Sequence, residues 1–127
     1  MPGKHLYEYA VIRLVPRVER EEFLNVGIIL FSKGSNYLNC KHQIDTEKLK
    51  LFSCELEVEE IENNLKAFEK ICKGGKEGGP IGQQAISSRF RWLTATRSTI
   101  LQTSPVHLGL CVDSEETLSR LFEQLVL

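Results

Sequence analysis

Tyr7-Glu-Tyr-Ala-Val-Ile-Arg-Leu-Val15 and Val26-Gly-Ile-Ile-Leu-Phe31 are the two clearest strand patterns of this 127-residue chain. The first alternates as a β-strand does, and one of its faces would carry Tyr7, Tyr9, Val11, Arg13 and Val15. The second is a continuous apolar run, which is typical of a central strand covered on both faces. Turn-forming residues at 33–36 separate it from a third alternating stretch over 37–44. These patterns predict an antiparallel meander of three strands.

The rest of the chain contains helical periods and two further strand patterns. Apolar residues at steps of three and four predict a helix over 57–72, which Gly74 is placed to end. Further helices are expected over 45–52, capped by Asp45, over 83–93, and after Asp113. Strands are expected over 97–103 and 106–112, and the glycine-rich residues 74–80 are expected to form a flexible surface loop. This order favours an α+β fold, with an antiparallel sheet of about five strands covered by about three to four helices.

Composition narrows the class of protein. The chain has 16 Lys plus Arg against 17 Asp plus Glu, and hydrophobic residues make up 42% of it. This length supports one hydrophobic core, so a single domain over 1–127 is expected. The near-neutral balance argues against a histone-like nucleic-acid binder. No apolar run is long enough to span a bilayer or to form a signal-peptide core, so a cytoplasmic protein without membrane contact is expected.

The cysteines give no indication of a metal site. Cys40, Cys54, Cys72 and Cys111 form no Cys-x-x-Cys pair, and no histidine lies at the spacing of a zinc finger. We therefore expect free thiols, packed as small apolar side chains, and neither a metal nor a cofactor.

Charge is unevenly distributed along the chain. No Asp or Glu occurs from Gly78 to Val112, although that stretch contains Arg89, Arg91 and Arg97. Such arginines are solvated, paired with carboxylates distant in sequence, or directed at an anion. Trp92 follows Arg91, and aromatic side chains beside guanidinium groups are common in base-stacking sites. Two interpretations stay open: Arg89 pairs with a glutamate at the core rim while Trp92 packs, or the segment forms an anion site.

Arg13 raises the same question on the first strand. Its neighbours on that face are apolar, so its guanidinium needs a partner. Glu22 and Asn25 lie one short link away, and an Arg13–Glu22 ion pair would be a structural bridge. Convergence of Arg13 with Arg91, Arg97 and His107 would instead create a positive pocket.

Five segments of the chain resemble a known family, and the resemblance covers nearly its whole length. The motifs are Tyr7–Pro16, Glu22–Phe31, Arg89–Thr94, Arg97–Ser104 and Val106–Gly109, and they are similar to the bacterial domain-of-unknown-function family 3037. The resemblance implies a small bacterial protein encoded near HipA-like kinases, and hence a possible accessory role beside such a kinase. It also directs attention to the polar motif positions Arg13, Glu22, Asn25, Arg91, Trp92 and His107.

Three functional hypotheses follow. The first is a binding or accessory module that engages an anionic ligand or an acidic partner surface through Arg13, Asn25, Arg91, Trp92 and Arg97. The second is a small enzyme acting on a phosphorylated or nucleic-acid substrate, with Glu22 or His107 as acid or base. The third is an internal polar network that orders the sheet.

Overall fold

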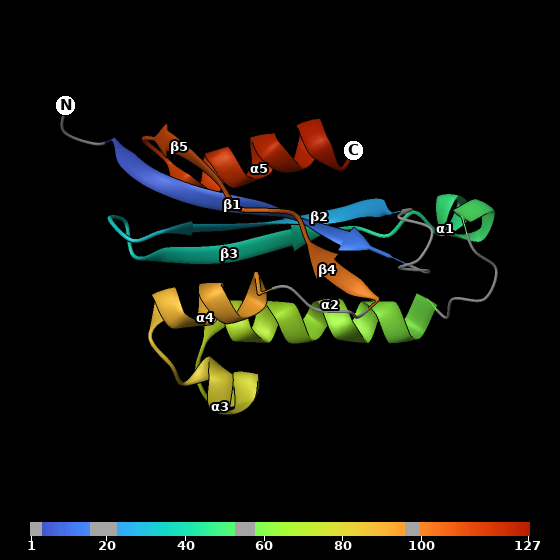
Figure 1. Ribbon diagram of the computed structural model, residues 1–127, viewed down its shortest axis with the longest axis horizontal. Coiled ribbons are helices and arrows are strands. Elements are labelled where there is room, and N and C mark those ends of the chain that lie inside the picture. The colour runs from blue at the N-terminus through green and yellow to red at the C-terminus, as the bar shows by residue number, and fades with distance from the viewer. Residues whose placement is uncertain (1–3, 16–22, 53–57, 96–99) are drawn as a thin grey trace.

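The computed structural model describes residues 4–15, 23–52, 58–95 and 100–127, which form an antiparallel sheet with helices on both faces (Figure 1). Its strands are β1 (His5–Leu14), β2 (Leu24–Ser32), β3 (Tyr37–His42), β4 (Leu101–Thr103) and β5 (His107–Cys111). β2 and β3 continue the meander from one edge of β1, while β4 and β5 both pair with its other edge. The α+β class and the predicted five-stranded sheet are confirmed.

The helices are α1 (Thr46–Phe52), α2 (Val58–Lys73), the 3-10 helix η2 (Lys76–Gly78), α3 (Gly79–Gly82), α4 (Ile86–Leu93) and α5 (Ser114–Leu125). α2 and α4 lie on one face of the sheet and α5 on the other (Figure 1). The predicted caps are present: Asp45 accepts from the N–H of Lys48, and Asp113 accepts from the N–H of Glu116. These bonds satisfy amides that have no partner within a helix.

The prediction of a flexible loop over 74–80 is wrong, because η2 and α3 begin within it. Its glycines allow backbone segments to approach closely. The N–H of Gly75 donates to the carbonyl of Gly82 over 2.8 Å, and a Cβ on Gly82 would lie 2.7 Å from the carbonyl oxygen of Gly75. The glycines therefore make a compact turn that a chain with larger side chains could not form.

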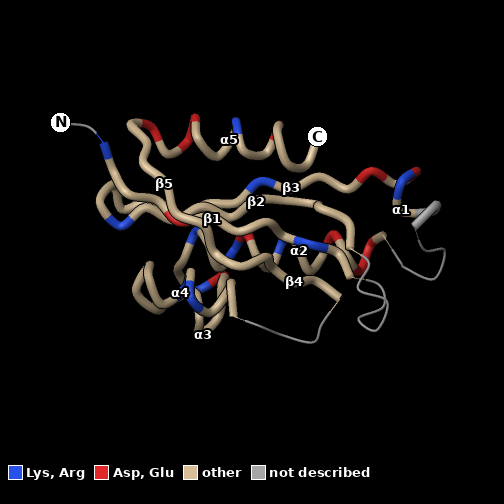
Figure 2. Tube along the Cα trace, turned by 45° about the horizontal axis from the view of Figure 1, so that its top comes forward, with Lys and Arg blue, Asp and Glu red and all other residues tan. Residues whose placement is uncertain are grey.

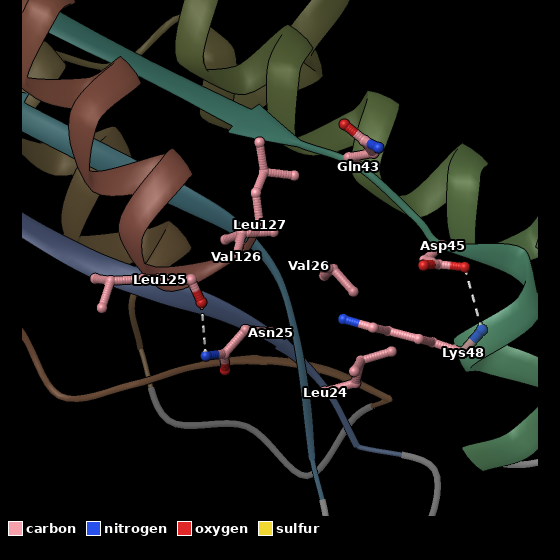
Figure 3. Close-up of a pocket in the computed structure, with 9 residues that line it drawn as sticks. All are labelled: Leu24, Asn25, Val26, Gln43, Asp45, Lys48, Leu125, Val126 and Leu127. Atoms are coloured by element: carbon pink, nitrogen blue, oxygen red, sulfur yellow. Dashed lines mark hydrogen bonds between the residues drawn. The ribbon is translucent and has the colours of Figure 1, made fainter.

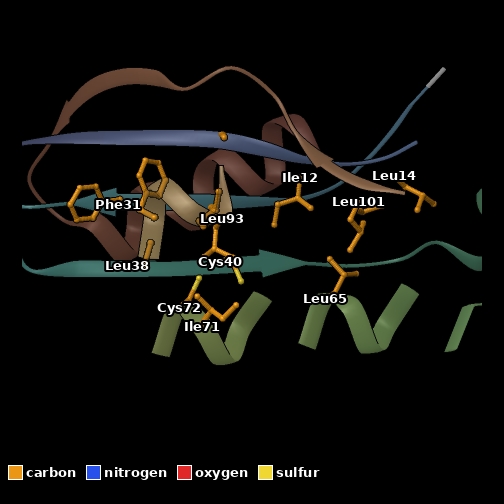
Figure 4. Packing of buried hydrophobic residues seen from close by; sticks show 14 of the residues in the cluster. Ile12, Leu14, Phe31, Leu38, Cys40, Leu65, Ile71, Cys72, Leu93 and Leu101 are labelled. Atoms are coloured by element: carbon orange, nitrogen blue, oxygen red, sulfur yellow. The ribbon is translucent and has the colours of Figure 1, made fainter. Parts of the chain in front are cut away.

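Alternation along β1 divides the core between the two faces of the sheet. Ile12 and Leu14 pack toward α2 and α4, whereas Tyr7 and Val11 pack toward α5, as the sequence pattern predicts. Figure 4 shows side chains of the larger cluster meeting between the sheet and α2. The predicted inward face of α2 is also confirmed, since it contributes Val58, Ile61, Leu65, Phe68 and Cys72 to this cluster.

One irregularity interrupts the pairing of β1 with β2. Ile12 lies opposite Gly27 and Arg13 lies opposite Asn25, so Val26 has no residue of its own to pair with on β1. This β-bulge places Val26 in the core toward α2, while the Asn25 amide donates to Leu125 on the α5 side. Asn25 and Arg13 thereby meet on one face of the sheet.

Gly27 should be required for this bulge. A Cβ there would lie 2.6 Å from the carbonyl oxygen of Lys41 and 3.0 Å from the Cβ of His42. We expect Gly27→Ala to lower the free energy of unfolding by about 1–3 kcal/mol in urea denaturation, because backbone must move to admit the methyl group. Gly34→Ala is the control, since its closest neighbour is the movable His5 ring. Wild-type stability of Gly27→Ala would contradict this account.

The Tyr37 hydroxyl, on β3, donates a hydrogen bond to the carboxylate of Glu115 in the first turn of α5. Burial, and next the hydrogen bond to Glu115, raise the pKa of Tyr37 well above its ordinary value. The folded state therefore holds this proton more tightly than the unfolded state does. Its contribution to stability is complete below about pH 10 and is lost above it, as the unfolded tyrosine ionises.

We accordingly expect the melting temperature of the wild type to fall relative to that of Tyr37→Phe as the pH rises above about 10. Lysines and the other tyrosines titrate in both proteins, so their effects cancel in the difference. A difference in melting temperature that stays constant across this range would contradict the assignment.

Candidate functional site

Arg13 and Asn25 form the most unusual polar arrangement among the described residues. They lie opposite one another across the β1–β2 pair, immediately beside the bulge. The Asn25 amide nitrogen donates to the carbonyl of Leu125 over 3.0 Å (Figure 3). The Arg13 Nε and the Asn25 Oδ1 are both buried and have no hydrogen-bond partner. A buried polar atom left in this state costs about 1–3 kcal/mol, so an unpaired donor and an unpaired acceptor on opposed residues need an explanation.

The Arg13 guanidinium is held by an aromatic ring. Its central carbon lies 4.1 Å from the centroid of the Phe23 ring, and Phe23 is 47% exposed. A cation–π contact of this kind orients the charge without using any N–H donor. No carboxylate of the described residues pairs with Arg13. The guanidinium is therefore positioned, and its buried Nε has no hydrogen-bond partner.

A hollow of about 420 Å³ adjoins Asn25, where β3 has ended and the last turn of α5 approaches β2 (Figure 3). Its lining comprises Leu24, Asn25, Val26, Gln43, Asp45, Lys48 and residues 125–127. The Lys48 side chain reaches into it, but Asp45 and the carbonyl end of α5 offset that positive charge. The hollow thus provides room and polar groups, whereas Arg13 is positively charged and pairs with no carboxylate of the described residues.

Arg91 lies in a different place, on the face of the sheet that α4 covers. Its two Nη atoms donate to the two carboxylate oxygens of Glu8 over 3.0 and 3.2 Å. The Arg91 side chain is 60% exposed and that of Glu8 only 17%. This pair stands in a second hollow of about 640 Å³, whose lining also includes Lys4, His5, Lys33 and Ser87. A carboxylate distant in sequence therefore accounts for Arg91.

Trp92 and His107 occupy two further locations. Trp92 is 40% exposed and lines a third hollow of about 250 Å³ with apolar residues of α2, including Phe68 and Ile71. His107 lies opposite Tyr9, and the two ring centroids are 5.2 Å apart, on the α5 side of the sheet. The sheet separates His107 from Arg91. The possible convergence of Arg13, Arg91 and His107 in one pocket is therefore not observed.

Glu22 and Arg97 lie outside the described residues, as does Cys54. Their proposed roles stay predictions. Within the described part of the chain, no cluster of three or more His, Cys, Asp or Glu residues is arranged to hold a metal ion.

One interpretation expected Arg89 to pair with a glutamate, but no described glutamate forms an ion pair with it. It donates instead to the carbonyls of Ile71 (2.9 Å), Cys72 (2.8 Å) and Gln84 (3.1 Å). The first two are carbonyls at the end of α2, which lack partners within the helix. The sequence from α3 to β5 contains no Asp or Glu, and Figure 2 shows its described parts without acidic residues. Arg89 donates there to backbone carbonyls. Arg89 thus caps the end of α2, although no acidic residue follows it closely in the sequence.

We expect Arg89→Met to lower the free energy of unfolding by about 2 kcal/mol, because it leaves partly buried carbonyls without a charged donor. Arg91→Met is the matched control and should cost less than about 1 kcal/mol, since exposed ion pairs contribute little. Urea denaturation of both variants checks this. Equal losses would show that Arg89 is not a helix cap.

The described cysteines behave as expected, since Cys40, Cys72 and Cys111 are free and buried. The sulfur atoms of Cys40 and Cys72 face each other between β3 and α2 (Figure 4). The contact with Cys40, and next burial, raise the pKa of the Cys72 thiol far above its ordinary range. Cys72 is therefore protonated near neutral pH and is no nucleophile.

The fold and the Arg13–Asn25 arrangement define a small α+β protein with a polar site at a bulge in its sheet. The chain belongs to the family described as Protein of unknown function (DUF3037), whose profile matches residues 9–126. Neither the curated proteins nor the solved structures compared with the chain gave a match. The helices formed by the described residues are all too short or too polar to cross a bilayer.

Proposed function

We propose that this protein is a binding module for a small anionic ligand that also carries a hydroxyl or amide group. Arg13 and Asn25 would be its principal contacts. The observation that carries the proposal is the pair of buried polar atoms, one donor and one acceptor, left without partners on opposed residues.

The two atoms require different hydrogen-bonding groups on a ligand. Arg13 Nε needs an acceptor, and the guanidinium charge favours an anionic oxygen. Asn25 Oδ1 needs an O–H or N–H, which a deprotonated carboxylate or phosphate does not have. Hydroxy acids, phosphorylated sugars and nucleotides supply both groups in one molecule. A water molecule also supplies both, so water is the alternative that the experiment must exclude.

The surroundings are suited to a ligand of that size. The hollow beside Asn25 measures about 420 Å³, within the usual range for small-molecule sites. Because Lys48 and Asp45 both line it, the part of the ligand lying there would be polar but uncharged. The anionic group would lie toward Arg13.

This proposal uses two of the five binding residues predicted from the sequence. Arg91 already has a carboxylate partner, and Trp92 lines another hollow. The enzyme hypothesis has less support, because no described carboxylate or imidazole is hydrogen-bonded to Arg13 or Asn25. An accessory role beside a HipA-like kinase, which the family resemblance implied, stays a prediction.

A thermal-shift series tests the proposal. The probes are glucose 6-phosphate, adenosine monophosphate and citrate, with sulfate and acetate as anions that carry no donor. A ligand at a hundred times its dissociation constant should stabilise the protein by about 2.7 kcal/mol. The Arg13→Met variant should lose that shift, whereas Arg91→Met, on the opposite face of the sheet, should keep it.

The stability of Arg13→Met without ligand separates binding from a structural role. Removing an unpartnered buried donor should leave stability within about 1 kcal/mol of the wild type, the loss being the contact with Phe23. A loss well above that value, together with no ligand shift in the wild type, would overturn the proposal and assign Arg13 to the internal polar network. An equal shift in wild type and Arg13→Met would also overturn it.

A further inference from the structure

The strand β5 forms part of an open edge of the sheet. It pairs with β1 on one side, and no other described strand pairs with it. Natural edge strands usually carry lysine, proline or another charged residue that prevents pairing with a second chain. The segment from Val106 to Val112 contains no Lys, Arg, Asp, Glu or Pro. Its edge is therefore unprotected.

An exposed apolar patch lies along this edge, on the side of the sheet that carries α4. Leu108 and Leu110 are 66% and 65% exposed, and Leu6, which lies opposite Leu110 on β1, is 56% exposed. Val112 follows in the same alternation and is 67% exposed. We call these four residues the edge patch. Contiguous apolar surface of this kind usually marks an interaction site.

The sequence of β5 is complementary to itself. Gly109 stands at its centre, with a leucine on each side. If two copies paired antiparallel about Gly109, Leu108 of each would lie opposite Leu110 of the other, and Val106 opposite Val112. Such a two-fold contact uses the same surface twice and brings no like charges together.

We propose that β5 is the interface between two copies of this chain, which pair β5 with β5 antiparallel about Gly109 and form one continuous sheet. This inference goes beyond the ligand site and does not depend on it. Each copy would cover its edge patch with that of the other. The backbone groups on the open side of β5 would gain partners in the same step.

The area available indicates how strong such a dimer would be. Four apolar side chains that are each more than half exposed provide on the order of 100 Å² apiece, or roughly 800 Å² over two copies. The paired backbones add to this, which brings the total near the ~1,200 Å² lower end of specific interfaces. We therefore expect a reversible dimer whose population rises with protein concentration.

Sedimentation equilibrium of the full chain, from about 1 µM to about 1 mM, tests the proposal, because a dimer of this size would dissociate within that range. The wild type should shift from monomer toward dimer. Leu110→Lys should stay monomeric, because it places a charge against the leucine of the second copy. Leu127→Lys is the matched control, since Leu127 is also 65% exposed but lies at the hollow beside Asn25. Urea denaturation should show both variants folded, because both side chains are exposed.

Cross-linking tests the register. A mixture of Leu108→Cys and Leu110→Cys proteins should form a disulfide between the two variants on oxidation, because these positions face each other about Gly109. Either variant alone should cross-link much less. A wild type that stays monomeric at the highest concentration would overturn the proposal, as would a dimer that Leu110→Lys leaves intact. A monomer that binds an extended apolar peptide along β5 would also overturn it, in favour of a different partner.

Discussion

β1 pairs with three other strands, and this pairing determines where the helices and the polar site lie. β1 is ten residues long, pairs with β2 along one edge, and pairs with β4 and β5 along the other. Ala10, Ile12 and Leu14 are fully buried on one face, while Tyr7 and Val11 are buried on the other. A strand buried in this way needs helices on both sides, which α2 and α4 provide on one side and α5 on the other.

Because β1 is buried on both faces, placing the Arg13 guanidinium on this strand is energetically unfavourable. A guanidinium near the end of a two-sided core must keep its charge solvated or paired, and among the described residues Arg13 contacts the face of Phe23 while its Nε has no hydrogen-bond partner. Folded proteins retain such features mainly where they serve a function. The bulge adds to this argument, since it brings the amide of Asn25 to the same place. Two polar groups and a backbone irregularity therefore coincide at one point of an otherwise regular sheet.

Local patterns in the sequence predicted most of the fold, because α2, the meander and the caps at Asp45 and Asp113 depend on neighbouring residues. Local patterns failed where contacts with backbone distant in sequence determine the structure. The glycines at 74–80 indicate a loop until the approach of Gly75 to Gly82 is known. Arg89 donates to the carbonyls at the end of α2, a contact that its neighbours in sequence do not indicate. For the site, Arg13 and Asn25 could be selected as polar residues near an apolar strand. That they oppose each other depends on a one-residue offset in pairing, which no periodicity shows.

The one-residue offset between β1 and β2 limits how the sequence of β2 can vary among relatives. β2 must present an unbroken apolar side to α2 and an amide to α5, and a regular two-residue period cannot do both over Asn25, Val26 and Gly27. The surplus residue shifts the phase of the strand, so that the core and the polar site no longer compete for the same positions. Without the offset, the same residues would place Val26 opposite Arg13 and Asn25 opposite Leu14, which would turn the amide toward α2. The register of β2 at this point, as much as residue identity, would then distinguish a relative that keeps the site from one that has only the fold.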